Sequence, residues 1–203
     1  MQETEKRAGL TLRDAVRLKR AINNRYNQKS VVNRTVVIKV ENDDFSPNPD
    51  TLVDIKIKLI GDQTLLSVKY GSWHGDMARQ EYEVGFRRGD LGGLFAILNL
   101  FGHTKFIVLT TVRTTWVSSG VVITLDEYST IGRALFEVEL EGGSTSDEHL
   151  IDDIFTSLDV EPMNSEQTVR FVSGVNMAKE IRIDLDRIHA DELAKRILAR
   201  HVA

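Results

Sequence analysis

Charged and apolar side chains alternate along several predicted strands, and this pattern constrains the fold more than any other feature of the sequence. Residues two apart on a strand share one face and lie roughly 6.5–7 Å apart. The segment Val53–Leu59 therefore places Asp54, Lys56 and Lys58 on one face and apolar residues on the other. An open sheet with a solvated face gives this alternation, and so does a closed antiparallel barrel with a polar interior. The pattern predicts antiparallel strands with one charged face and leaves both arrangements open.

The sign of the charge differs from strand to strand. The basic residues on these faces are Lys56, Lys58, Lys69, Arg79 and Arg113, and the acidic residues are Asp54, Glu81, Glu83, Asp126, Glu137 and Glu139. Lysine and arginine neutralise phosphate oxygens, and paired carboxylates bind hard cations such as Mg²⁺ and Mn²⁺. Strand faces that converge would therefore suit a metal–polyphosphate site. A solvated face with cross-strand ion pairs, each worth about 0.2–1 kcal/mol, explains any single strand equally well.

Hydrophobic periodicity predicts an α+β chain with most of its strands in the middle. Helices are expected where apolar residues recur every three to four positions, over Thr11–Tyr26, Leu91–Phe101, His149–Leu158 and Ala190–His201. Strands are expected over Ser30–Val40, Leu52–Ile60, Thr64–Tyr70, Arg79–Phe86, Phe106–Trp116, Gly120–Leu125 and Arg133–Leu140.

Composition narrows the class of protein. A chain of 203 residues is typical of one domain. The absence of cysteine excludes disulfides and thiolate metal sites, and it fits a cytoplasmic, reducing compartment. The polar N-terminus predicts no signal peptide, and no apolar run is long enough for a membrane helix. The net charge of −4 argues against bulk nucleic acid as a partner.

The order of these segments resembles the CYTH family, which is named for class IV adenylyl cyclases and thiamine triphosphatases. Val121–Tyr128 and then Ile131–Glu139 look like the strand–turn–strand of the family that ends in paired glutamates. Upstream, Val53–Lys58, Leu65–Lys69 and Arg79–Glu83 follow the family's order of basic, lysine and Arg-x-Glu-x-Glu strands. The resemblance covers roughly residues 1–175.

The resemblance implies a fold, a domain plan and a function. The implied fold is α+β, an antiparallel β-barrel tunnel flanked by helices. Residues 1–175 would form the tunnel domain, and residues 176–203 would be a helical extension packed on it. The implied function is metal-dependent hydrolysis of inorganic triphosphate or of an organic or nucleoside triphosphate, by a monomer or homodimer. The alternatives are a tunnel that binds polyphosphate or nucleotide without turnover, a class IV-type adenylyl cyclase, and an interaction protein whose charges face outward.

The resemblance also assigns roles to individual residues. Phosphate oxygens would be bound by Lys56, Lys58, Lys69, Arg79 and Arg113. Mg²⁺ or Mn²⁺ would be held by Glu3, Glu5, Glu137 and Glu139, with Glu81 or Glu83 assisting, and Asp126 would be a further ligand or would orient a basic group. The expected catalytic residues are Glu137, Glu139 and Lys69.

Two positions depart from the family pattern. The N-terminal Glu-x-Glu-x-Lys strand of the family has its counterpart in Glu3-Thr4-Glu5-Lys6-Arg7, where Arg7 replaces the lysine. Thr111 stands where the family usually carries a lysine, two positions before the arginine. Both departures favour the alternative that binds without turnover.

Overall fold

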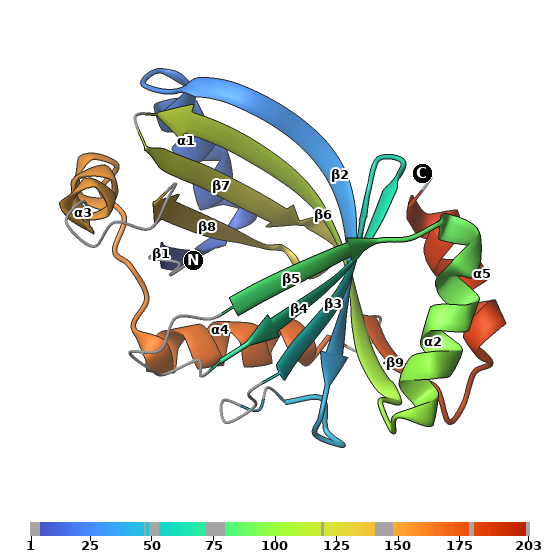
Figure 1. Cartoon of the computed structure of the whole chain (residues 1–203). Coiled ribbons are helices and arrows are strands. Elements are labelled where there is room, and N and C mark those ends of the chain that lie inside the picture. The colour runs from blue at the N-terminus through green and yellow to red at the C-terminus, as the bar shows by residue number, and fades with distance from the viewer. Residues whose placement is uncertain are drawn as a thin grey trace. The chain divides into compact units, whose positions relative to one another are not determined.

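The structure, a computed structural model, describes residues 5–46, 48, 53–71, 80–118, 120–140, 148–178 and 181–201 (Figure 1). The strands are β1 (Glu5–Thr11), β2 (Asn27–Val40), β3 (Val53–Ile60), β4 (Gln63–Tyr70), β5 (Gln80–Gly85), β6 (Lys105–Ser118), β7 (Val121–Tyr128), β8 (Arg133–Leu140) and β9 (Arg182–Asp184). The α-helices are α1 (Leu12–Asn23), α2 (Leu91–Leu100), α3 (Glu148–Ser157), α4 (Ser165–Asn176) and α5 (Ala190–His201). The predicted α+β class is therefore confirmed.

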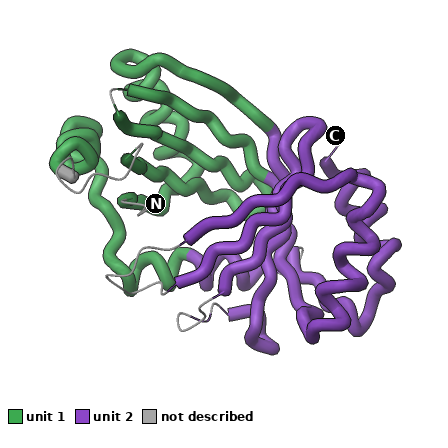
Figure 2. The backbone as a smooth tube through the Cα atoms, in the orientation of Figure 1, with its two compact units in different colours: residues 1–32, 76–79, 111–171 green, residues 33–75, 80–110, 172–203 purple. Residues whose placement is uncertain are grey.

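The strands form one sheet in which hydrogen-bonded neighbours follow the order β1-β8-β7-β6-β2-β3-β4-β5, with β9 on β6. The pairs within β1-β8-β7-β6 and within β2-β3-β4-β5 are antiparallel, and so is the pair of β6 with β9. The chain divides into two compact units (Figure 2). Unit 1 contains residues 1–32, 76–79 and 111–171, and unit 2 contains residues 33–75, 80–110 and 172–203. The predicted domain boundary at residue 175 stays a prediction.

Unit 1 has a core built on the apolar face of its strands. Burial alternates along β8, where Phe136 and Val138 are fully buried and Glu137 between them is partly exposed. This face packs against α1 and α3, and the rings of Phe136 and Phe155 lie 5.2 Å apart. The opposite face of the same strands therefore carries the polar and charged side chains.

Unit 2 has a separate core beneath α2 and α5, which lie side by side. The helices cover the apolar face of β3, and Phe95 on α2 packs edge-on against Phe106 with ring centroids 5.4 Å apart. At the end of α5, the two ring nitrogens of His201 lie 3.1 Å from the Thr35 hydroxyl and 3.1 Å from the Gly61 carbonyl oxygen. Since β3 is covered on this side, its charged residues lie on the other face.

The N-terminal strand β1 is longer than the Glu3–Arg7 segment that the sequence suggests, and Glu3 lies outside the described residues. It pairs with β8, and the Arg7 carbonyl oxygen also accepts a hydrogen bond of 2.7 Å from the N–H of Met163. Phe171 on α4 lies so close to Gly9 that a Cβ atom there would come within 2.4 Å of the ring. These contacts fix the strand that carries Glu5 and Arg7.

Helices α1, α2, α3 and α5 begin within one residue of their predicted starts. Thr11 caps α1 by accepting the Asp14 N–H at 3.2 Å, as its position before the apolar stripe predicts. Helix α4 was not expected, although Asn164 and Gln167 form a reciprocal capping pair at its start, with both hydrogen bonds 2.9 Å long. None of the described helices has both the length and the apolar character needed to cross a membrane.

Candidate functional site

The polar face of β3, β4 and β5 in unit 2 brings lysines and carboxylates together. The register places Lys69 opposite Asp54 on β3 and opposite Glu81 on β5. Lys56 lies opposite Ser67, so it shares this face. The set Asp54, Lys56, Lys58, Lys69, Glu81 and Glu83 is called the lysine face below.

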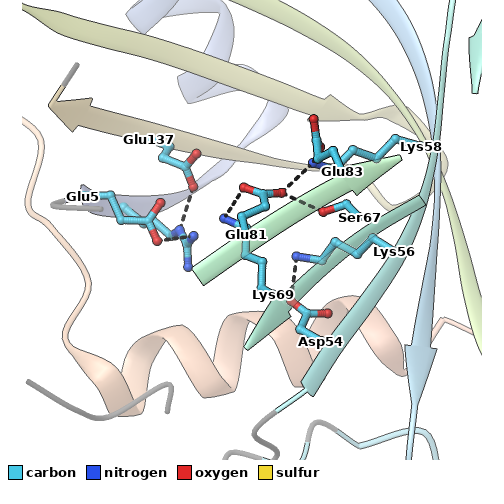
Figure 3. Close-up of polar contacts among 10 residues, drawn as sticks. Glu5, Asp54, Lys56, Lys58, Ser67, Lys69, Glu81, Glu83 and Glu137 are labelled. Carbon is cyan, nitrogen blue, oxygen red and sulfur yellow. Dashed lines mark hydrogen bonds and ion pairs between the residues drawn. The ribbon is translucent and has the colours of Figure 1, made fainter. Parts of the chain in front are cut away.

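The side chains of the lysine face bond to one another across three strands (Figure 3). The Lys58 ammonium group donates to Glu81 at 3.0 Å and to Glu83 at 2.6 Å, reaching across β4 to β5. Ser67 donates its hydroxyl to Glu81 at 2.6 Å, and the Lys69 Nζ lies 3.2 Å from the same carboxylate. Lys56 Nζ lies 2.9 Å from Asp54 on its own strand.

This network holds the ammonium groups in fixed positions on a partly buried surface. The side chains of Lys58 and Lys69 keep only 16% and 15% of their area exposed. An ammonium group has three N–H donors, so a lysine that bonds to two carboxylates can still bond to a phosphate oxygen. The lysine face therefore offers oriented cations to an anion without the cost of ordering long side chains at the moment of binding.

Glu81 is the carboxylate at the centre of this network. Burial acts to raise its pKa, but hydrogen bonds from Ser67 and Lys58 and the charge of Lys69 outweigh burial and lower the pKa to about 2. Glu81 is thus an ionised hydrogen-bond acceptor across the physiological pH range, and its chemical role is to orient the two lysines rather than to donate a proton.

The lowered pKa of Glu81 predicts a pH-dependent contribution to stability. The folded pKa of about 2 lies below the ordinary value of 4.5, so the ionised form stabilises the fold above pH 4.5, and this stabilisation is lost as the pH falls towards 2. We expect Glu81→Gln to lower the free energy of unfolding most at neutral pH, with the difference from wild type shrinking below pH 4.5. Urea unfolding at a series of pH values measures this.

Glu166→Gln is the matched control for that series, because the Glu166 side chain is 74% exposed and bonds to Arg170 in the next turn of the same helix. Its difference from wild type is expected to stay small at every pH. A Glu81→Gln difference that stays constant between neutral pH and pH 2.5 would contradict the assignment of Glu81 as a strongly stabilised carboxylate.

In unit 1, Arg7 joins two carboxylates on the polar face of β1 and β8. The register places Arg7 opposite Glu137 and Glu5 opposite Glu139. Arg7 Nε donates to Glu137 at 2.6 Å, and the guanidinium also forms an ion pair with Glu5. Burial acts to lower the pKa of Arg7, but the charges of Glu137 and Glu5 raise it further above its ordinary value. The set Glu5, Arg7, Glu137 and Glu139 is called the arginine–glutamate cluster below.

Arg113 and Asp126 form another ion pair of unit 1, between β6 and β7. Arg113 donates two parallel hydrogen bonds to the Asp126 carboxylate, one of them 2.8 Å long from Nε. Of the two expected roles for Asp126, its position matches the orientation of a basic group. Thr111 on β6 shares this face, and the buried hydroxyls of Thr111 and Thr124 have no hydrogen-bond partner among the described residues. They are polar atoms that a water molecule or an anion oxygen could satisfy.

Comparison with known proteins supports the fold and not the sequence family. No protein-family model and no curated protein matches the sequence. The PH1012 protein of Pyrococcus horikoshii OT3 is 13% identical with a TM-score of 0.58, over 81% of this chain and 93% of that one. A Vibrio parahaemolyticus protein described as a proposed adenylate cyclase is 12% identical with a TM-score of 0.57, over 84% and 98%. A proposed adenylyl cyclase from Hippeastrum with a dominant triphosphatase activity is 14% identical with a TM-score of 0.55, over 84% and 95%.

At least 93% of each of these three structures is matched by this chain, so the likeness extends over the whole fold. The chain has the CYTH-type fold. The predicted antiparallel architecture with flanking helices is thereby confirmed. At identities of 12–14% the likeness shows the fold and does not show the substrate.

The acidic residues in the described part of the chain do not form a metal centre of the kind that the CYTH-type fold implies. Among the residues that the structure describes, no group of three or more acidic or histidine side chains is arranged to hold a metal ion. Glu5 and Glu137 bond to Arg7, Asp126 bonds to Arg113, and Glu81 and Glu83 bond to Lys58. Their carboxylates are already neutralised by cations of the chain, so they do not fit a resident Mg²⁺ or Mn²⁺ ion in this arrangement.

The structure therefore sorts the predicted site residues into two groups. Lys56, Lys58, Lys69, Glu81 and Glu83 meet in unit 2, and Glu5, Arg113, Asp126, Glu137 and Glu139 share the polar face of unit 1. Glu3 and Arg79 lie outside the described residues. The pairing of Arg7 with Glu137 was not predicted from the sequence. The sequence signal for it is that Arg7 stands two residues after Glu5, and therefore on the same face of the strand.

Proposed function

We propose that this chain binds a triphosphate on the lysine face and hydrolyses it, as a divergent member of the CYTH family. The observation that carries the proposal is the placement of Lys56, Lys58 and Lys69 on one partly buried face. A chain of phosphates presents oxygens at regular intervals, and a row of ammonium groups on neighbouring strands matches such a ligand. Ordinary ion pairing on a solvated surface does not require lysines that are about 85% buried.

The chemistry asked of the protein is mainly positioning and charge stabilisation. Phosphoryl transfer spreads negative charge over the transferred group and the leaving oxygen, and fixed cations stabilise that charge. Lys58 and Lys69 are the residues placed for this, because Glu81 orients both. The divalent cation, Mg²⁺ or Mn²⁺, is proposed to arrive as the metal complex of the triphosphate, since Mg²⁺ is commonly bound by substrate phosphates with few protein ligands.

A second candidate is a binding protein that holds a triphosphate or polyphosphate without turnover. The observation that favours it is the ion pair of Arg7 with Glu5 and Glu137, which occupies carboxylates that a metal-dependent hydrolase would use. The two candidates share the lysine face and differ only in turnover, so a single assay separates them.

The test measures the release of phosphate from tripolyphosphate, ATP and thiamine triphosphate. Each substrate is assayed with Mg²⁺, with Mn²⁺ and with EDTA. The formation of cyclic AMP from ATP is measured under the same conditions. Metal-dependent phosphate release is the expected result, and the best substrate of the panel would identify the class. Triphosphate binding without release would replace the hydrolase by the binding protein. Cyclic AMP as the main product would replace it by a cyclase, and neither binding nor product would overturn the proposal.

A further inference from the structure

Three carboxylates occupy adjoining positions on the polar face of β1 and β8. Glu5 lies directly opposite Glu139, and Glu137 lies two residues before Glu139 on the same strand. Directly opposite residues on antiparallel strands have Cβ atoms about 5 Å apart, within the reach of glutamate side chains towards a common point. Carboxylate oxygens are the ligands that a hard divalent cation prefers, but the described side chains here are not arranged around a metal ion.

The common point of two of these carboxylates is occupied by the side chain of Arg7. The guanidinium bonds to Glu137 at 2.6 Å and pairs with Glu5, and Arg7 lies opposite Glu137 in the strand register. All three side chains are mostly covered, with 28%, 23% and 14% of the area of Arg7, Glu5 and Glu137 exposed. The planar guanidinium has donors on several edges, so one arginine can serve two carboxylates at once.

A guanidinium at this place changes what the carboxylates can bind. Arginine stays protonated at every pH at which the protein is folded, and Glu137 and Glu5 raise its pKa further. A divalent ion bound by the same two carboxylates would lie next to a fixed positive charge or would have to displace it. An ion beside the guanidinium would be repelled by a like charge at a partly buried position. An ion that displaced the guanidinium would leave Arg7 without its bonds to Glu5 and Glu137.

We propose that Arg7 is a built-in counter-cation that takes the place of a divalent metal ion on Glu5 and Glu137. The free protein then carries no metal at the arginine–glutamate cluster, and its fold in unit 1 does not depend on one. The proposal concerns the protein without substrate, so it is independent of the hydrolysis proposed above and is tested without any triphosphate.

The test is a titration of each protein with Mn²⁺ in which the free ion is followed by electron paramagnetic resonance. Wild type and Glu137→Gln are expected to take up the same amount of Mn²⁺, because Glu137 holds none. Arg7→Gln removes the guanidinium that bonds to Glu5 and Glu137. It is expected to gain one Mn²⁺ per chain, and Arg7→Gln/Glu137→Gln is expected to lose that ion again.

Arg170→Gln is the matched control, because it removes an arginine from the same unit whose ion pair is with Glu166, one helical turn away. It is expected to gain no Mn²⁺. Circular dichroism establishes that each variant is folded. If Arg7→Gln does not fold, the comparison of wild type with Glu137→Gln still shows whether the wild-type protein holds Mn²⁺ through Glu137.

Either of two results would overturn the proposal. The first is one Mn²⁺ bound by wild type and absent from Glu137→Gln, which would mean that the metal displaces Arg7. The second is a folded Arg7→Gln protein that binds no more Mn²⁺ than wild type, which would mean that the three carboxylates do not form a cation site when the arginine is gone.

Discussion

Replacing Arg7 by alanine is expected to lower the free energy of unfolding by about 3 kcal/mol, because it removes the guanidinium that bonds to two mostly buried carboxylates. The value lies at the low end for a broken buried ion pair, since Arg7 keeps 28% of its side chain exposed. For a chain of this size such a loss lowers the melting temperature by about 10 °C. Thermal unfolding followed by circular dichroism measures it.

Arg170→Ala provides the comparison within the same unit. Arg170 and Glu166 form an ion pair one helical turn apart, and both side chains are about three-quarters exposed. The expected cost is at most about 0.5 kcal/mol. Adding Glu137→Gln to Arg7→Ala is expected to recover part of the lost stability, because one of the two carboxylate charges that bonded to Arg7 is removed. An Arg7→Ala protein as stable as Arg170→Ala would contradict the view that the arginine–glutamate cluster stabilises unit 1.

The second large effect is expected on turnover when the two oriented lysines are neutralised together. Lys58→Gln/Lys69→Gln removes two ammonium groups from the lysine face while it keeps similar side-chain length and hydrogen-bonding capacity. Removal of one donor that stabilises transition-state charge commonly lowers kcat by 10²–10³-fold, so we expect kcat/KM for tripolyphosphate to fall by at least about 10²-fold. Steady-state phosphate release measures this.

Lys195→Gln is the control for that variant, because Lys195 lies on the exposed side of α5 in the same unit. Its kcat/KM is expected to stay within about twofold of wild type, as is usual for surface substitutions. Melting temperatures of the three proteins distinguish a loss of catalytic groups from a loss of folded protein. A double lysine variant that is folded and fully active would place the reaction elsewhere.

Much of the fold could be predicted because burial follows strand and helix periodicity closely. In β8, the alternation of Phe136 and Val138 with Glu137 and Glu139 in the sequence is the alternation of buried and partly exposed residues in the structure. Helix α5 spans the predicted residues. Helix α4 was missed because Gly174 and three β-branched valines weaken its pattern, and its capping pair carries the signal instead.

The side-chain partners were harder to predict, because they depend on register between distant segments. Arg7 and Glu137 are 130 residues apart and meet only when β1 pairs with β8 in one of several possible registers. Lys58 and Glu83 lie on strands that are not neighbours, and their contact depends on two pairings at once. The charge pattern therefore predicted the right faces but not which cation each carboxylate would bind.

The most direct test of the central claim is calorimetric titration of wild type and of Lys58→Gln/Lys69→Gln with tripolyphosphate in EDTA. Wild type is expected to bind one tripolyphosphate per chain without metal, added salt is expected to weaken the binding, and the folded double variant is expected to lose it. Failure of wild type to bind, or equal affinity in the double variant, would contradict the claim that the lysine face is a triphosphate site.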